Sequence, residues 1–271
     1  MRHNPRNGFY VCAVALLLTI PEAWAGGWPL APGAAEAITS LTWLTADERY
    51  DAGGNKVGAS RYTKLEISPY IEYGLTGNLT LIGELAWSRE KTEYFGTEFR
   101  NDDLSRLKAG GRLALGVWED TLFSLQPLFT LNLAGSGDDP AATESGDIDS
   151  ELALVLARGE TLSGLDIFSV QEIAYGYRDS NRPDEVRADI TLGLKPRSGT
   201  MLLLKSLNTV AVTSASNGDR YSSSRLALSV VQALPEALAP GWSVEAGAEQ
   251  TLFGRSTIEG TTVRIALWRR F

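Results

Sequence analysis

Charged side chains recur at every second position along several stretches of the sequence, and this spacing limits the chemistry they can perform. Arg106, Lys108 and Arg112 share one parity, while Leu107 and Leu113 have the other. Because successive side chains in a strand point to opposite faces, these cations would lie on one face of a strand. Fixed charges of this kind pair with one another or line a polar conduit that selects solutes. The candidate lining residues are Lys64, Glu66, Glu72, Glu84, Arg106, Lys108, Arg112, Arg187, Asp189 and Arg264.

The residue types that most catalytic sites require are nearly absent. The only histidine is His3 and the only cysteine is Cys12. Catalytic triads need an imidazole, and disulfides or thiolate metal sites need cysteines. Glu245 and Glu249 could form an acid–base pair, but four positions along a strand separate them by roughly 13 Å, too far for a glycosidase pair. We therefore expect no enzyme, no metal site and no cofactor.

The chain is acidic, with a formal net charge of −8, which argues against nucleic acid as a partner. Asp47–Lys56 is one acidic stretch, and Gly135–Asp139 with Glu144, Asp147 and Asp149 is another. Both are acidic enough to attract Ca²⁺, but neither has the ligand spacing of a calcium-binding loop. Solvated outer loops are the better interpretation.

The charged positions alternate with apolar ones, and the stretch 261–271 shows this most clearly. Val263, Ile265, Leu267 and Phe271 share one face, and the other face carries Arg264, Ala266, Trp268 and Arg270. About twelve strands with this alternation are predicted, over 37–44, 65–73, 79–90, 106–117, 123–133, 151–157, 165–177, 186–195, 201–209, 224–234, 242–252 and 261–271. Strands of roughly 9–11 residues cross a hydrocarbon layer at a tilt.

The connections between these strands alternate in length. Long ones are expected around Ala52 and over 91–103, 134–150, 178–185 and 210–223. Short ones are expected over 74–78, 119–120, 158–164 and 196–200, and moderate ones over 235–241 and 253–260. Bacterial barrels have short periplasmic turns and longer outer loops. The alternation therefore predicts an all-β fold, a single transmembrane antiparallel β-barrel with an even strand number and both termini in the periplasm.

Three local features complete the prediction. Pro69 and Pro127 fall inside strands, where we interpret them as bulges. The apolar run Met201–Leu204 leaves the inward face of its strand unassigned. Aromatic girdles at the membrane interfaces are predicted from Trp43, Tyr73, Trp87, Tyr175, Tyr177 and Trp268.

The N-terminus has the pattern of a secretory leader. Arg2 and Arg6 precede an apolar run over Phe9–Ile20, and Ala23-Trp24-Ala25 provides a small-residue cleavage site. The domains are thus a signal peptide over 1–25 and a barrel over 26–271. The Pro- and Gly-rich start of the mature chain, Gly26–Gly33, is expected to be a short entry segment in the periplasm.

The terminal strand ends on an aromatic residue, and here the sequence resembles bacterial outer-membrane β-barrels. In that class the last strand is the signal for the barrel-assembly machinery, which implies this role for Val263, Ile265, Leu267 and Phe271. Three local stretches, Trp28-Pro29 with Pro32-Gly33, Asp51–Gly54 and Glu72–Thr80, resemble barrels associated with exopolysaccharide clusters and with phenol-degradation pathways. That similarity implies export or uptake of a solute.

Two functions remain open at this point. The first is a narrow, porin-like channel for small solutes or saccharides in the cell outer membrane of a Gram-negative organism. The second is a non-conducting structural or docking barrel of an export or exopolysaccharide system. Either one implies outer-membrane lipids, lipopolysaccharide and the barrel-assembly machinery as partners.

Overall fold

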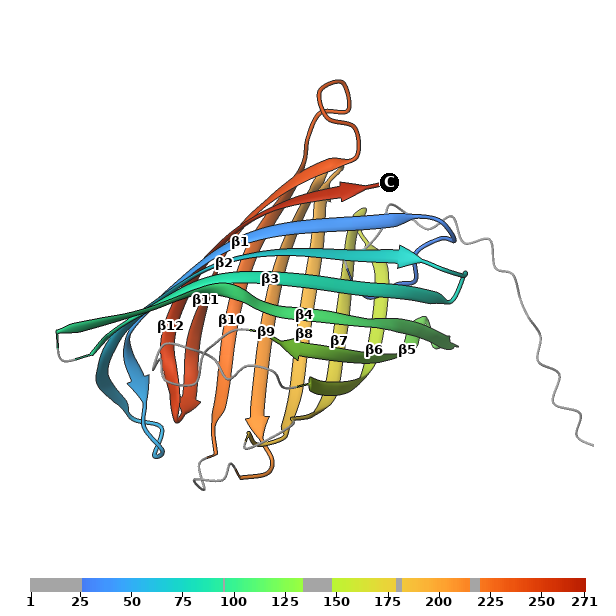
Figure 1. Ribbon diagram of the computed structural model, residues 1–271. Helices are drawn as coiled ribbons and strands as arrows, with labels where there is room; N and C mark the ends of the chain where they lie inside the picture. The colour runs from blue at the N-terminus through green and yellow to red at the C-terminus, as the bar shows by residue number, and fades with distance from the viewer. Residues whose placement is uncertain (1–25, 95, 134–147, 179–181, 215–219) are drawn as a thin grey trace, which may run out of the picture.

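Every strand pairs with its neighbours in sequence, and the first strand pairs with the last (Figure 1). This computed structural model describes residues 26–94, 96–133, 148–178, 182–214 and 220–271. The leader predicted over residues 1–25 lies outside the described residues. Because the sheet closes on itself, no strand leaves an edge of unpaired backbone groups. The predicted all-β, closed antiparallel barrel of twelve strands is confirmed.

All twelve predicted strands occur, and most are longer than the alternation indicated. Their bounds are β1 (Ala35–Tyr50), β2 (Lys56–Gly74), β3 (Leu79–Tyr94), β4 (Thr97–Trp118), β5 (Thr121–Asn132), β6 (Ile148–Leu162), β7 (Leu165–Tyr177), β8 (Glu185–Arg197), β9 (Thr200–Ala211), β10 (Ser222–Ala233), β11 (Trp242–Arg255) and β12 (Thr257–Arg270).

Three predicted connections are wrong because the strands continue through them. Residues 51–55 join β1 to β2, residues 95–96 join β3 to β4, and Ser256 alone joins β11 to β12. Ion pairs across the strands stabilise these extensions, with Arg89 2.6 Å from Asp102 and Lys91 2.5 Å from Glu98. Apolar alternation marks only part of a strand, since backbone pairing continues where both faces are polar.

The two strand prolines do not form bulges, so that prediction is also wrong. The register between β2 and β3 is the same before and after Pro69, and the register between β4 and β5 does not change around Pro127. On their other sides the two prolines pair in register with β1 and β6. At each proline the pairing with one neighbouring strand is interrupted, but the register between the two strands does not change. Register shifts occur elsewhere, for example beside Asp47 in β1.

Alternation along the strands separates an apolar outer face from an inner face rich in polar side chains. Exposed apolar side chains include Leu41, Ile71, Leu107, Leu192, Leu228 and Ile265. Buried polar ones include Glu36, Glu72, Ser88, Arg112, Gln126 and Glu245. Within β9, Met201 and Leu203 are buried and Leu204 is exposed, which assigns the face that the sequence left open.

The described residues contain no helix long and apolar enough to cross a membrane.

Both ends of the barrel sequence lie at the same rim. Ala35 and Phe271 exchange backbone hydrogen bonds, with Phe271 N donating to Ala35 O at 2.9 Å. We call this the terminal rim; it also carries the turns after β2, β4, β6, β8 and β10, and the other end is the opposite rim. Glu119 and Asp120 turn the chain there with φ of 48° and 63°, as a tight hairpin requires. The periplasmic placement of this rim remains a prediction.

Candidate functional site

A network of ion pairs covers the inner face of β2, β3 and β4. Arg106 Nη2 lies 2.6 Å from Glu84 Oε1 and 3.1 Å from Glu66 Oε1. Lys64 Nζ is 3.1 Å from Glu66 Oε2, so this carboxylate joins a cation of β2 to one of β4. Lys108 is held more loosely, 4.0 Å from Glu84. The network satisfies most of the charge on this wall and limits how far its side chains can reach across the lumen.

Arg112 forms the most enclosed part of this wall. The Arg112 and Glu72 side chains are each only 4% exposed and lie 2.8 Å apart. Arg112 Nε donates to Gln126 Oε1 at 2.9 Å, and the Tyr70 hydroxyl donates to Glu72 Oε1 at 2.5 Å. Gln126 Nε2 in turn donates to Glu172 on β7 at 3.3 Å. Strands from β2 to β7 are thus connected through side chains inside the barrel.

Arg187 is the centre of a second network on β6, β7 and β8. Its Nη2 lies 2.5 Å from Glu172 Oε1 and 2.9 Å from Glu151 Oε1, and its Nη1 lies 3.9 Å from Asp189. Asp189 also accepts the backbone N–H of Asn208 at 3.0 Å. One guanidinium therefore contacts three carboxylates from three adjacent strands.

Polar or mixed cavities lie inside the barrel among the described residues. One of about 220 Å³ is lined by Arg106, Lys108, Arg178 and Arg187 among others. A second of about 270 Å³ is lined by the Arg187 partners Glu172 and Asp189, and reaches Trp268. A third of about 230 Å³ lies along β9 to β12 and shares Lys205, Leu207 and Arg264 with the second.

The wall formed by β9 to β12 has fewer ion pairs. Glu245, 1% exposed, accepts hydrogen bonds from Arg264 Nε at 3.3 Å and Trp268 Nε1 at 3.1 Å. Arg225 pairs with Glu249 at 2.9 Å. Trp268 is only 5% exposed, so its predicted place in an interfacial girdle is wrong. Trp268 lies four positions after Arg264 in β12, so it shares the inward-facing side of the strand with Arg264.

The N-terminal segment, residues 26–34, crosses the lumen at the terminal rim. A Cβ on Gly27 would lie 2.8 Å from Val170 and 2.9 Å from Ala157, so only glycine can approach the wall this closely. The Trp28 ring meets Phe168 edge-on with centroids 6.1 Å apart, and Leu30 N donates to Thr80 Oγ1 at 3.1 Å. The sequence placed this segment outside the barrel as an entry segment. In the structure it is packed inside the terminal mouth.

An apolar cluster supports that segment. Trp28, Ile38 and Val170 pack against the buried side chains Phe168, Met201, Leu203, Val231, Ala266 and Trp268. The cluster draws on β7, β9, β10 and β12, so it lines much of the mouth beneath the segment. Burial of this apolar surface favours the closed arrangement.

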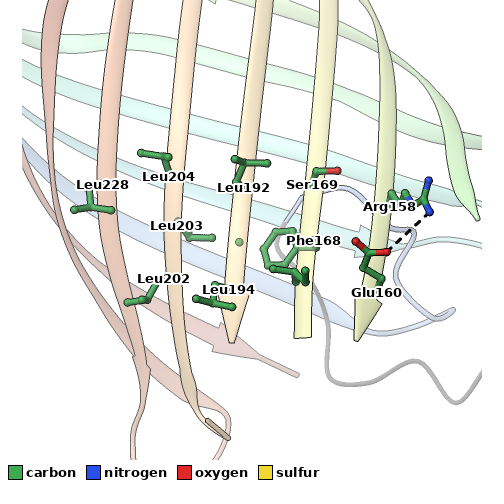
Figure 2. Close-up of a pocket in the computed structure, with 12 residues that line it drawn as sticks. Arg158, Glu160, Phe168, Ser169, Leu192, Leu194, Leu202, Leu203, Leu204 and Leu228 are labelled. Carbon is green, nitrogen blue, oxygen red and sulfur yellow. Dashed lines mark ion pairs between the residues drawn. The ribbon is translucent and has the colours of Figure 1, made fainter. Parts of the chain in front are cut away.

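The outer wall carries an apolar groove where β8 has a glycine in line with a buried aromatic ring (Figure 2). The groove has a volume of about 500 Å³, and leucines of β8, β9 and β10 surround it. A Cβ on Gly193 would lie 1.9 Å from the Phe168 ring, so the ring occupies the space that a side chain would need. Arg158 and Glu160 lie at one end, 4.0 Å apart.

The structure brings the ten candidate side chains into the ion-pair networks just described. Nine of the ten form pairs in the two networks or along their margins, and Arg264 pairs with Glu245. The candidate lining predicted from the sequence did not include Glu36, Glu90, Asp149, Glu151, Glu172, Arg178, Glu185 and Lys205. Alternation could have found Lys205 once Met201 and Leu203 were known to be buried.

The acidic stretches do not converge on a metal site within the described residues. Asp51 Oδ1 instead accepts the backbone N–H of Asn55 at 2.8 Å, which shapes the turn after β1. Asp149 belongs to β6 and lies 2.6 Å from both Arg178 and Arg182. Gly135–Asp139, Glu144 and Asp147 fall outside the described residues.

The four terminal-strand residues point away from the lumen. Val263, Ile265 and Leu267 are exposed on the outer face of β12, and Phe271 is 70% exposed at its end. Their role as an assembly signal remains a prediction.

Comparison with known proteins finds similarity in structure alone. No protein-family model matches the sequence, and no curated protein does. The barrel is similar to the COG4313 outer membrane channel from Pseudomonas putida F1, with a TM-score of 0.70 and 14% identity, over 92% of this chain and 99% of that one.

Two autotransporter barrels are also similar. The transport unit of AIDA-I from Escherichia coli gives a TM-score of 0.52 at 9% identity over 94% of each chain. The translocator domain of NalP from Neisseria meningitidis gives 0.50 at 13% identity over 89% of this chain and 90% of that one. At these identities the likeness shows the fold alone. The chain therefore has the outer-membrane β-barrel fold, and the resemblance predicted from its terminal strand is confirmed.

Proposed function

We propose that this barrel is a narrow channel for small solutes or saccharides in the bacterial outer membrane, and that residues 26–34 close it at the terminal rim. The carrying observation is a set of cavities lined by inward-facing side chains, one of which reaches Gly26 of a segment that is not part of the wall. Side chains and a short segment can move without opening the backbone ladder. A transport path therefore requires no change in the barrel itself.

Arg187 and its partners link two of the cavities on this proposed path. Arg187 lines the cavity of about 220 Å³, and its partners Glu172 and Asp189 line the one of about 270 Å³. A solute passing between the cavities must displace or replace one of these contacts. Charged and hydroxyl groups can do so by offering hydrogen bonds of their own, which favours polar solutes over inert ones.

The ten candidate residues are proposed as the lining of this path. Replacing Arg106, Lys108 and Arg112 together with glutamine should shift ion selectivity away from anions, and the shift should shrink near 1 M salt, where the Debye length is about 3 Å. The measurement is the reversal potential under a salt gradient. Unchanged selectivity in a conducting, folded variant would remove these three residues from the path.

The segment supplies the direct test of the channel. Trp28→Ala should raise single-channel conductance in planar bilayers, because it removes the ring that packs on Phe168 and the apolar cluster. Trp118→Ala is the matched control, since Trp118 is exposed at the terminal rim away from the segment. Silent bilayers with both variants would contradict the proposal.

A non-conducting structural or docking barrel is the second candidate. The observation that favours it is the cross-linking of β2 to β7 through Arg112, Gln126 and Glu172, which fills one side of the lumen. Wild-type protein and Trp28→Ala that both insert fully, yet pass no current, would support this second function. Neither candidate includes an enzymatic step, and we propose none.

A further inference from the structure

One cation in the barrel has no partner among the described residues. Lys205 lies on the inner face of β9 and lines both the cavity of about 270 Å³ and the adjoining one of about 230 Å³. Its side chain is partly enclosed by the barrel wall. No described residue accepts a hydrogen bond from its Nζ or forms an ion pair with it. Glu245 and Glu249 influence its charge from a greater distance.

The carboxylates that line the larger cavity each have a nearer donor. Glu36 pairs with Arg270 at 2.7 Å and Glu72 with Arg112 at 2.8 Å. Glu172 pairs with Arg187 at 2.5 Å. Asp189 accepts from the Asn208 backbone at 3.0 Å and lies near Arg187.

The carboxylates closest to Lys205 in the adjoining cavity are also in use. Glu245 accepts from Arg264 and Trp268, and Glu249 pairs with Arg225 at 2.9 Å. The ammonium is thus the charge in these two cavities that lacks a counter-group. A partly enclosed ammonium that has no ion-pair partner attracts an entering anion more strongly than a cation whose charge a carboxylate already offsets.

We propose that Lys205 is the binding site for the carboxylate of a small monocarboxylic acid, with Arg264 as the second cation beside it. The apolar side chains Ile38, Leu203 and Leu207 line the same cavity, with Trp268 at its edge, and would contact an apolar body. The volume of about 270 Å³ lies just below the range of about 300–1,000 Å³ typical of small-molecule sites, which limits the ligand to a compact one. This inference rests on the proposed channel and names its solute class.

The competing possibility is that Lys205 is a neutral amine in its enclosed position. A neutral amine needs no counter-ion and gives no preference for a charged ligand over a neutral one of the same shape. Benzoate and benzamide differ in this respect while sharing a ring of the same size. The pair therefore separates charge recognition from burial of the ring.

The experiment is calorimetric titration of the full-length mature protein in a nonionic detergent with each of the two compounds. Benzoate should bind at least about tenfold more tightly than benzamide to the wild type, as a charge-assisted hydrogen bond predicts. Lys205→Met should lose this preference. Lys56→Met is the matched control and should keep it, because Lys56 pairs with Glu259 at the opposite rim, 2.8 Å away.

Equal affinities of benzoate and benzamide for the wild type would overturn the assignment, and this comparison needs no variant to fold. Retention of the preference in Lys205→Met would also overturn it. Glucuronate carries its carboxylate on a polar body. If it bound more tightly than benzoate, the inference that the ligand has an apolar body would be overturned. If the barrel conducts but shows no preference for benzoate, the Lys205 site is refuted and the proposed channel is not. If the barrel shows the preference but does not conduct, the site is supported and the proposed channel is refuted.

Discussion

Removing Arg112 should destabilise the barrel far more than removing an exposed arginine with an equally short ion pair. Arg112 and Glu72 are 2.8 Å apart and each 4% exposed. At that distance the Coulomb attraction is about 6 kcal/mol for an effective dielectric constant of about 20. Desolvation of both groups offsets much of it, and breaking one side of such a pair typically costs about 3–5 kcal/mol.

The contacts that remain in the variant place the expected loss of unfolding free energy near the lower end of this range. Glu72 keeps the hydrogen bond from Tyr70 at 2.5 Å, which continues to compensate its charge. Gln126, however, loses its donor at 2.9 Å. We expect Arg112→Met to lower the free energy of unfolding by about 3 kcal/mol. The double variant Arg112→Met, Glu72→Gln should recover part of this loss, because no unpaired charge remains inside.

The assay is urea unfolding of the protein in lipid vesicles, followed by tryptophan fluorescence. Arg89→Met is the matched control, because Arg89 lies 2.6 Å from Asp102 but both side chains are largely exposed. Its loss should be below about 1 kcal/mol. Equal losses for Arg112→Met and Arg89→Met would refute the reasoning, because the larger loss expected for Arg112 comes from the burial of its pair with Glu72.

Two further predictions concern the wall. Leu267→Arg should cost about 2–4 kcal/mol if that position lies near the bilayer midplane. It should also lower the amount of inserted protein, whereas Leu267→Met should not. Deletion of Phe271 should reduce insertion too, because its backbone exchanges hydrogen bonds with Ala35 at the seam where β12 meets β1. Normal outer-membrane levels of Leu267→Arg and of the deletion would contradict the lipid-facing assignment and the seam role. Gly193→Ala should cost about 1–3 kcal/mol, because its Cβ would overlap the Phe168 ring, and Phe168→Leu in the same chain should restore stability. Full stability of Gly193→Ala alone would show that the ring moves aside freely.

The barrel could be predicted from the sequence because one rule governs both of its faces. Alternation placed Val263, Ile265 and Leu267 outside and Arg264 opposite them, as found. The rule failed where both faces are polar, so the extensions of β3 and β4 held by Lys91 and Glu98 were assigned to a loop. It also failed at Met201–Leu204, where both faces are apolar, and Lys205 was missed with that strand.

The closure of the terminal mouth could not be predicted from alternation. Gly27, Trp28 and Leu30 belong to no strand, and their positions depend on a gap between side chains of β3, β6 and β7. Pro- and Gly-rich composition excludes regular structure but does not say where a segment packs. The pairing of Arg112 with Glu72 was open for a similar reason, because strand parity gives the face of a residue and leaves its partner undetermined.

A reversible lock on the N-terminal segment tests the channel most directly. Leu30 N lies 3.1 Å from Thr80 Oγ1, and Cys12, the only cysteine, falls in the predicted leader, so Leu30→Cys with Thr80→Cys would put two cysteines at contacting positions, where oxidation can be tested for a disulfide. We expect the oxidised protein to pass no current in planar bilayers and the same protein to conduct after reduction. Equal current in the two states, or none in either, would contradict closure of a conduit by residues 26–34.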